Sequence, residues 1–155
     1  MSTNVPCSPV PLDKSTRGTP TILCIDDNPD VSYAIELHLR AFDVRVVRAF
    51  HGMHGFAEAS RHHPDLIVMD LAMPNGDGAT ILECIRRNAR VAATPVIILT
   101  AMRDPVLKRR LFALGADGFL SKPLSFDDLA HEISRFVDLH PREESGEEST
   151  GEQGT

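Results

Sequence analysis

The heptapeptide Thr21-Ile22-Leu23-Cys24-Ile25-Asp26-Asp27 is a short apolar run that ends in two carboxylates. Three other apolar runs also end at polar side chains: residues 66–69 precede Asp70, residues 96–99 precede Thr100, and residues 119–120 precede Ser121 and Lys122. A fifth run, residues 44–47, is followed by no reactive side chain. Ligands of open α/β sheets bind outside the carboxyl ends of the strands. The pattern therefore predicts that three carboxylates, a hydroxyl and a lysine meet in one crevice.

Helical signals lie between the apolar runs. Asn28-Pro29 provides a cap and a first-turn proline for a helix whose apolar face runs from Val31 to Phe42. Four further helices are expected over residues 55–61, after Asp77, from Pro105 to Gly115, and from Ser125 through Val137. The nearly continuous hydrophobic runs are typical of parallel strands that are covered on both faces. The sequence thus predicts an α/β fold, a (βα)5 doubly wound parallel sheet with the flavodoxin-like strand order 2-1-3-4-5.

The bulk properties favour one domain without a membrane span. The chain has 155 residues, 42% of them hydrophobic, and a net charge of −6. We expect a disordered Pro-rich leader at residues 1–20, the folded domain at residues 21–140 and a disordered acidic tail at residues 141–155. Three widely spaced cysteines and no signal-peptide pattern favour the cytoplasm. No stretch has the basic density of a nucleic-acid surface, so direct contact with nucleic acid is not expected.

The polar residues at the strand ends suit phosphoryl transfer. Close carboxylates repel one another unless a cation lies between them, and Mg²⁺ is the simplest cation for an all-oxygen site. Asp26 and Asp27 alone would fit helix caps equally well, but Asp70 and Lys122 at the matching strand ends favour the metal interpretation. A lysine and a threonine hydroxyl can both contact a phosphoryl oxygen. A carboxylate in such a site can act as the nucleophile and form an aspartyl phosphate.

Five segments together resemble the receiver domain of two-component response regulators. They are Asp26-Asp27, residues 70–78 (DLAMPNGDG), Thr100-Ala101, residues 115–119 (GADGF) and Lys122-Pro123. The segments occur in order and at suitable spacings over about residues 20–140. The resemblance implies that Asp70 is the phosphoacceptor. It also implies a Mg²⁺ site, with Mn²⁺ as a substitute, made by Asp26, Asp27, Asp70 and the main-chain carbonyl of Ala72, with Asp26 acting mainly through bound water.

The same resemblance assigns the remaining site residues. It implies that Thr100, Ala101 and Lys122 bind the phosphoryl group. Thr100 and Phe119 would form a switch pair, in which the hydroxyl moves to the phosphoryl group and the aromatic ring turns inward. The peptide bond between Lys122 and Pro123 is a candidate for the cis form.

The implied function is a phosphorylation-controlled signalling switch of the stand-alone, single-domain type. A sensor histidine kinase or a histidine phosphotransfer protein would donate the phosphoryl group to Asp70. Output would pass to an unknown downstream protein or along a phosphorelay, and a homodimer through the face of the fourth helix, fifth strand and fifth helix is one option. The only enzymatic activities expected are self-phosphorylation from a phosphodonor and slow autodephosphorylation.

Three alternatives stay open at this point. The chain could be a receiver fragment of a larger regulator, or an adaptor that uses the fold without phosphorylation. An aspartyl-phosphate phosphatase of the haloacid-dehalogenase type fits less well. Such an enzyme needs a second Asp at the position of Ala72, together with a cap domain. A nucleotide-binding switch is disfavoured because no Gly-Lys-Ser/Thr motif follows the first strand.

Overall fold

The computed structural model describes residues 18–73 and 76–143. Most of the predicted leader and tail therefore lies outside the described residues. The described chain continues past the predicted boundary at residue 140, because Phe42 and Pro141 form an antiparallel bridge and Arg142 N donates to Ala41 O at 2.8 Å. Within the described residues, no helix is both long enough and apolar enough to cross a membrane.

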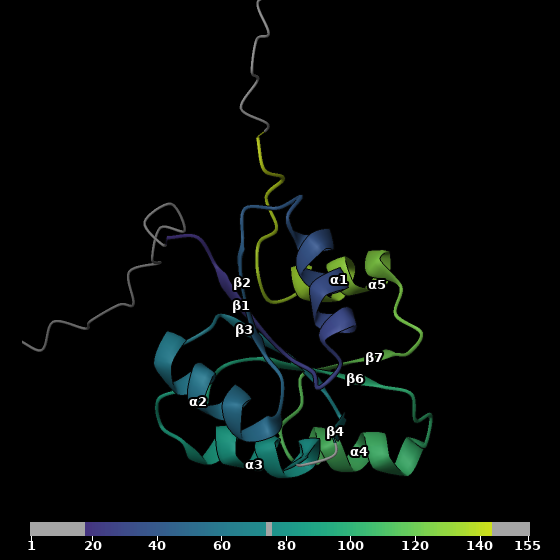
Figure 1. Cartoon of the computed structure of the whole chain (residues 1–155). Helices are drawn as coiled ribbons and strands as arrows, with labels where there is room; N and C mark the ends of the chain where they lie inside the picture. Colours follow the sequence, from purple (N-terminus) through teal and green to yellow (C-terminus); the bar gives the residue numbers. More distant parts are fainter. Residues whose placement is uncertain (1–17, 74–75, 144–155) are drawn as a thin grey trace, which may run out of the picture.

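Five parallel strands form the central sheet (Figure 1). They are β1 (Thr21–Ile25), β2 (Arg45–Ala49), β3 (Leu66–Asp70), β6 (Val96–Thr100) and β7 (Gly118–Ser121), in the order β2-β1-β3-β6-β7. This order confirms the predicted topology. Between β3 and β6, the chain forms a separate antiparallel pair of short strands, β4 (Ala72–Met73) and β5 (Gly76–Asp77). This pair was not predicted from the sequence.

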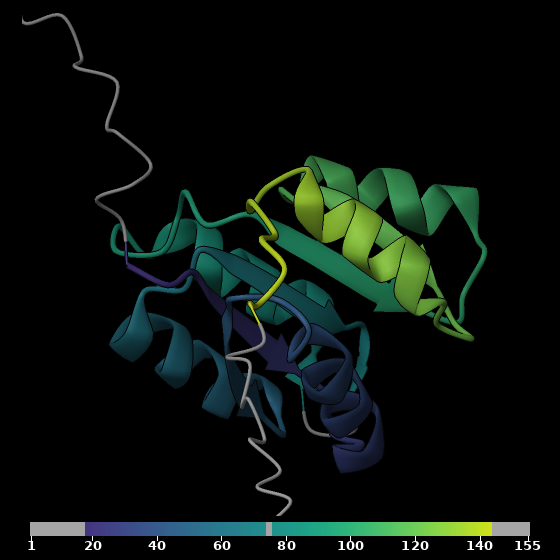
Figure 2. The same ribbon diagram turned by 90° about the horizontal axis from the view of Figure 1, so that it is seen from above.

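Five helices cover the two faces of the sheet. They are α1 (Pro29–Leu39), α2 (Gly52–His62), α3 (Gly78–Arg87), α4 (Pro105–Ala113) and α5 (Phe126–Ser134). Helices α1 and α5 lie on one face, which is nearest the viewer in Figure 2, and α2, α3 and α4 lie on the other. The doubly wound arrangement predicted from the sequence is therefore confirmed.

Alternate residues of the strands supply the two halves of the core. In β1, Leu23 and Ile25 pack in the cluster under α2, α3 and α4, whereas Ile22 and Cys24 pack in the cluster under α1 and α5. Burial of Cys24 raises the pKa of its thiol to about 12, so this side chain stays protonated and behaves as a small hydrophobe. Complete burial of both faces of β3 and β6 explains why the runs 66–69 and 96–99 lack polar residues.

Several helix ends differ from the predictions. Helix α1 ends at Leu39 and α5 at Ser134, so Phe42 and Val137 lie in the segments that follow. Helix α2 begins at Gly52 rather than Gly55, because the side chain of His51 accepts a hydrogen bond from the main chain of His54 and caps the helix. Gly55 suits this helix because a Cβ there would lie 2.5 Å from Ile25 Cδ1.

A network around Arg86 ties α3 to the amino end of the sheet. Its guanidinium donates twice to Gly115 O, at 2.6 and 3.0 Å, and once each to Ala92 O and Thr94 O. Its fifth hydrogen bond goes to Asp117 Oδ2 at 2.8 Å, which also accepts from Val96 N at the start of β6. All five donors of the guanidinium fork are therefore used.

We predict that Arg86→Met lowers the free energy of unfolding by about 2–4 kcal/mol, because three main-chain carbonyls and a carboxylate lose their donor. Urea denaturation measures the loss. Arg87→Met is the matched control, because Arg87 is the next residue of α3 and is exposed. Equal stability of the two variants would contradict a structural role for the Arg86 network.

Candidate functional site

The strand register brings the predicted residues to one edge of the sheet. Ile25 pairs with Met69, so Asp26 and Asp70 leave neighbouring strands at the same level. On the other side of β3, Asp70 pairs with Leu99, which places Thr100 one residue further along β6. Thr100 in turn pairs with Ser121, and the ladder continues with Lys122 N donating to Thr100 O at 2.9 Å. We call this side of the sheet the carboxyl edge.

Three carboxylates converge at the carboxyl edge. One oxygen from each of Asp26, Asp27 and Asp70 lies within 4.8 Å of the others. Asp26 is 2% exposed and Asp70 is 5% exposed, whereas Asp27 is on the surface. The cluster therefore has two buried members and one that faces solvent.

Asp26 has the least favourable environment of the three. Its Oδ1 accepts from Asn28 N at 2.9 Å, but its buried Oδ2 has no hydrogen-bond partner among the described residues. Burial raises the pKa of Asp26 above its ordinary value, and the charges of Asp70 and Asp27 add to this shift, while the Asn28 amide and Lys122 oppose it. Neighbouring positive charge and hydrogen-bond donors therefore compensate the negative charge of the cluster only in part.

Lys122, the residue that follows β7, places its ammonium group against this cluster. Its Nζ lies 3.3 Å from Asp70 Oδ1 and 3.6 Å from Asp26 Oδ2. The second contact is an ion pair beyond hydrogen-bonding distance, which is why Asp26 Oδ2 remains without a hydrogen bond. The peptide bond between Lys122 and Pro123 is cis.

Thr100 and Phe119 lie on the neighbouring strands. Thr100 is buried, and its Oγ1 accepts from Met102 N at 3.0 Å. Phe119 is half-buried; its ring centroid lies 4.7 Å from that of Phe112, and Lys108 Nζ lies 5.6 Å from it. Phe112 was not singled out from the sequence, although its spacing of four residues from Lys108 places both on one face of α4.

The loop that follows β3 approaches the site closely. Ala72 N donates to Asp70 Oδ1 at 3.4 Å, and Gly78 N donates to Leu71 O at 3.2 Å. A Cβ on Gly78 would lie 2.9 Å from Leu71 O, so only glycine permits this approach without a shift. Ala72 and Ala101, which directly follow Leu71 and Thr100, are exposed.

The donor set fits a hard divalent cation. All side-chain donors of the cluster are carboxylate oxygens, which Mg²⁺ prefers, and the orphaned Oδ2 of Asp26 has an unmet need for positive charge. The residues that would hold the ion are Asp26, Asp27 and Asp70.

Comparisons with known proteins agree with this geometry. The response regulator receiver domain family matches residues 22–134. The chain belongs to this family. The transcriptional regulator RpaA of Synechocystis is 38% identical over 110 residues, which cover 71% of this chain and 46% of the regulator. The chain thus spans about half the length of this relative.

Solved receiver domains share the fold. The chemotaxis protein CheY4 of Vibrio cholerae has a TM-score of 0.74 at 26% identity, covering 77% of this chain and all of that one. The receiver domain of the sensor histidine kinase PA1611 from Pseudomonas aeruginosa has a TM-score of 0.70 at 28% identity, covering 77% of this chain and 98% of that one, and holds a magnesium ion in its active-site cleft. Receiver domains bind Mg²⁺ at an acidic pocket and receive phosphoryl groups from histidine kinases or phosphotransfer proteins.

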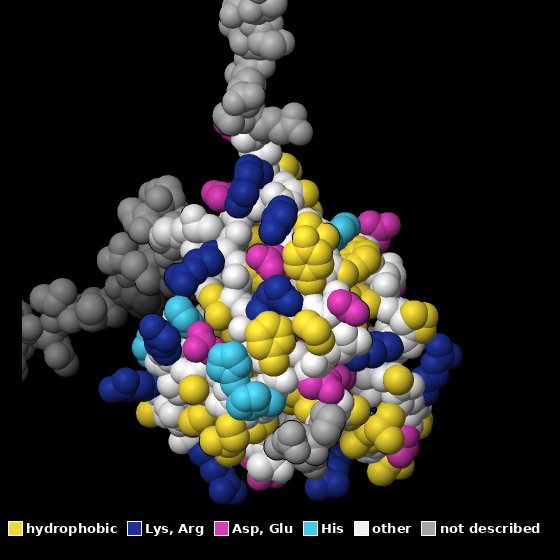
Figure 3. Space-filling model, viewed as in Figure 1, with side chains coloured by type: hydrophobic (Ala, Val, Ile, Leu, Met, Phe, Trp, Pro, Cys, Tyr) yellow, Lys and Arg dark blue, Asp and Glu magenta, His cyan; other side chains and the backbone are white. Residues whose placement is uncertain are grey.

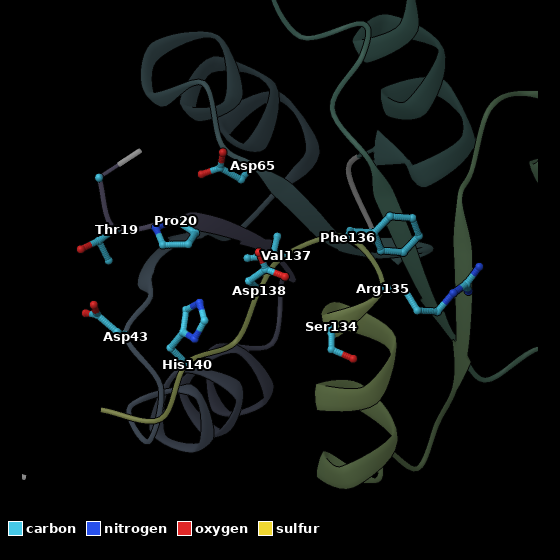
Figure 4. Close-up of a pocket in the computed structure, with 11 residues that line it drawn as sticks. Thr19, Pro20, Asp43, Asp65, Ser134, Arg135, Phe136, Val137, Asp138 and His140 are labelled. Atoms are coloured by element: carbon cyan, nitrogen blue, oxygen red, sulfur yellow. The ribbon is translucent and has the colours of Figure 1, made fainter. Parts of the chain in front are cut away.

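A hollow on the surface of this receiver domain lies away from the three carboxylates of the site (Figure 4). Its volume is about 590 Å³, and it is lined by Pro20, Asp43 and Asp65, which precede β1, β2 and β3, and by residues after α5 such as Val137 and His140. These positions are at the amino ends of the strands. The hollow therefore lies at the end of the sheet opposite the carboxylates. Despite its volume, we do not assign the phosphoryl chemistry to it.

We predict that Asp26→Asn stabilises the metal-free receiver domain at neutral pH by about 1 kcal/mol, because it removes a buried charge and keeps the acceptor for Asn28 N. Since the pKa of Asp26 is raised on folding, the native state binds a proton more tightly than the unfolded state. The parent therefore loses stability as pH rises through that pKa, and the gain of the variant shrinks as pH falls below it.

Urea denaturation without Mg²⁺ over a pH series measures this difference. Asp43→Asn is the control, because Asp43 is exposed and lies at the opposite edge of the sheet. A variant less stable than the parent at neutral pH would show that the ion pair with Lys122 outweighs the burial of Asp26.

Proposed function

We propose that this chain is a signalling switch that accepts a phosphoryl group on Asp70. The proposal is carried by one observation: the carboxylate of Asp70 is 5% exposed, lies in a cluster with two other carboxylates, and has Lys122 Nζ 3.3 Å from its Oδ1. A nucleophilic carboxylate in such a place gains from fixed neighbouring charges, since phosphoryl transfer depends on positioning and charge neutralisation.

In the proposed step, a carboxylate oxygen of Asp70 attacks the phosphorus of a phosphohistidine. The new bond joins this oxygen to phosphorus, and the bond between phosphorus and the imidazole nitrogen breaks with its electron pair leaving on the imidazole. Water later attacks the acyl phosphate, which releases inorganic phosphate and restores the carboxylate. Lys122 would pair with the phosphoryl oxygens, and the Thr100 hydroxyl and the main chain at Ala101 would donate to them.

A divalent cation has a defined place in this proposal. Asp27, Asp70 and the main-chain carbonyl of Ala72 would hold Mg²⁺, with Asp26 acting through bound water. When bound, Mg²⁺ neutralises charge on the carboxylates and on the incoming phosphoryl oxygens. Mn²⁺ would substitute, because it also suits carboxylate and carbonyl ligands.

The switch would pass from Thr100 to Phe119. The hydroxyl of Thr100 now accepts from Met102 N, so engagement with a phosphoryl group would change the loop that precedes α4. Phe119 contacts Phe112 and Lys108 of α4, which connects this helix to the ring that would turn inward. The face of α4, β7 and α5 is our proposed surface for self-association.

The proposed partners follow from the chemistry. A sensor histidine kinase or a histidine phosphotransfer protein would donate the phosphoryl group, and a further protein would bind the phosphorylated form. The cytoplasm, where such donors work on a reduced protein, is the proposed location.

We predict that incubation with Mg²⁺ and acetyl phosphate adds one phosphoryl group, measured as intact mass, and that Asp70→Asn abolishes the addition. Asp65→Asn is the matched control, because Asp65 precedes the same strand at its opposite end and should leave the addition unchanged. An adduct on the Asp70→Asn protein would assign the phosphoacceptor elsewhere. No adduct on the parent, with Mg²⁺ binding demonstrated, would favour an adaptor that works without phosphorylation.

A further inference from the structure

A second, smaller hollow lies beside the carboxyl edge, between α3 and α4. Its volume is about 200 Å³, and its walls come from four segments: Leu71 and Ala72 after β3, Ala79 of α3, Met102 after β6, and Leu107 and Leu111 of α4. We call it the α3–α4 pocket. An engineered apolar cavity of about 150 Å³ admits benzene, so this pocket has room for one large apolar side chain.

The rim of the α3–α4 pocket exposes an apolar side chain to water. Met102, which lines the pocket, is 59% exposed. Methionine adapts its shape to different partners and is frequent at binding surfaces. In Figure 3, hydrophobic side chains, several basic ones and some acidic ones lie on the lower part of the molecule, where Figure 1 places α3 and α4.

The α4 wall of the pocket is positive for an acidic protein, whereas the opposite wall at Leu71 and Ala72 adjoins Asp70. Residues 101–113 carry four cations, Arg103, Lys108, Arg109 and Arg110, and one anion, Asp104. The segment therefore has a net charge of +3 in a chain of net charge −6. Asp104 caps α4 through a bond to Val106 N, and Arg110 lines the pocket itself. A negatively charged partner would be attracted to this face.

The same charges exclude several occupants. A second copy bound pocket to pocket would bring two Arg110 side chains and two basic α4 walls together, which would repel. Residues 1–17 carry one negative and two positive charges, so their sign is also wrong. Residues 144–155 are acidic, but they contain no large apolar side chain to fill the pocket. What remains is a separate protein that is acidic and carries an apolar anchor.

We propose that the α3–α4 pocket is a docking site for an acidic segment of a partner protein, which inserts one large apolar side chain between α3 and α4 and places carboxylates near Arg110. Burial of such a side chain supplies affinity, and the basic rim supplies attraction and orientation. The site differs from the face of α4, β7 and α5 proposed above, because Leu107, Arg110 and Leu111 line it. Lys108 and Phe112 of α4 instead contact Phe119 of β7.

The pocket is built on the loops that would sense phosphorylation, so this part of the inference rests on the proposed function. Met102 N donates to Thr100 Oγ1, and Ala72 N donates to Asp70 Oδ1. A phosphoryl group on Asp70 would change both acceptors and shift two walls of the pocket. Partner binding and phosphorylation must then influence one another by the same factor, whichever comes first.

Two synthetic peptides test the docking site on the full chain. One is a run of glutamates around a single phenylalanine, and the other replaces this phenylalanine with alanine. We expect saturable binding of the first peptide, with methyl NMR shifts at Met102, Leu107 and Leu111, and binding of the second that is weaker by about tenfold or more. Equal binding of both peptides, or shifts centred elsewhere, would overturn the proposal.

Charge reversal provides matched variants. Arg110→Glu should weaken the phenylalanine peptide by about fivefold or more, whereas Arg109→Glu, an exposed neighbour that does not line the pocket, should weaken it less than about twofold. Both positions are exposed on α4, so both variants should keep the parental circular dichroism spectrum. An equal loss of affinity in the two variants would show that the attraction is non-specific electrostatics. That result would overturn the proposed docking at this pocket.

Phosphorylation separates the two proposals. The peptide is titrated before and after treatment with acetyl phosphate and Mg²⁺, with the adduct followed by intact mass. We expect its affinity to change by about fivefold or more when the adduct forms. An adduct without a change in affinity would overturn the coupling but not the phosphorylation. A failure to form any adduct would overturn the proposed function, while the peptide titrations would still decide whether the pocket binds.

Discussion

The site depends on the repulsion between carboxylates that the parallel sheet forces together. Because β1 and β3 are neighbours and run in the same direction, Asp26 and Asp70 must leave the sheet side by side. Lys122 is the cation that the structure places against both, and it leaves one oxygen of Asp26 without a hydrogen bond. Burial raises the pKa of Asp26, and the charges of Asp70 and Asp27 add to the shift. A bound divalent cation would relieve this repulsion, because it supplies positive charge to the carboxylate oxygens.

The order of strands and helices could be predicted because each strand of the central sheet coincides with its own apolar run in the sequence. A run such as residues 66–69 has apolar side chains at every position, which only a strand covered on both faces requires. The limits of α2 were harder to predict, because Gly52 and Gly55 lower helix propensity in the sequence. Their benefit appears only in three dimensions, where Gly55 lets the helix approach Ile25 closely. The β4–β5 pair also escaped prediction, since strands of two residues leave no periodic pattern.

For the site, position along the chain predicted which residues meet, but not how each is surrounded. Asp26 and Asp27 are adjacent and chemically identical, yet the first is buried and the second faces solvent. This difference arises from the direction in which each side chain leaves β1, and tertiary packing decides its consequences. The contact between Phe112 and Phe119 was likewise hidden, because the two residues come from different elements and meet only when α4 packs on the sheet.

The Arg86 network holds the carboxyl-terminal end of α4 in place, whereas its amino-terminal end has no such anchor among the described hydrogen bonds. Gly115, directly after this helix and its cap, accepts two hydrogen bonds from the guanidinium, whereas the segment from Ala101 to Asp104 at the other end is exposed. A rigid rod that is pinned at one end pivots rather than slides. A helix of 9 residues is about 13 Å long, so a small rotation about Gly115 becomes its largest displacement beside Thr100. If α4 turned about Gly115, its displacement would therefore be largest at the carboxyl edge and smallest at the amino ends of the strands.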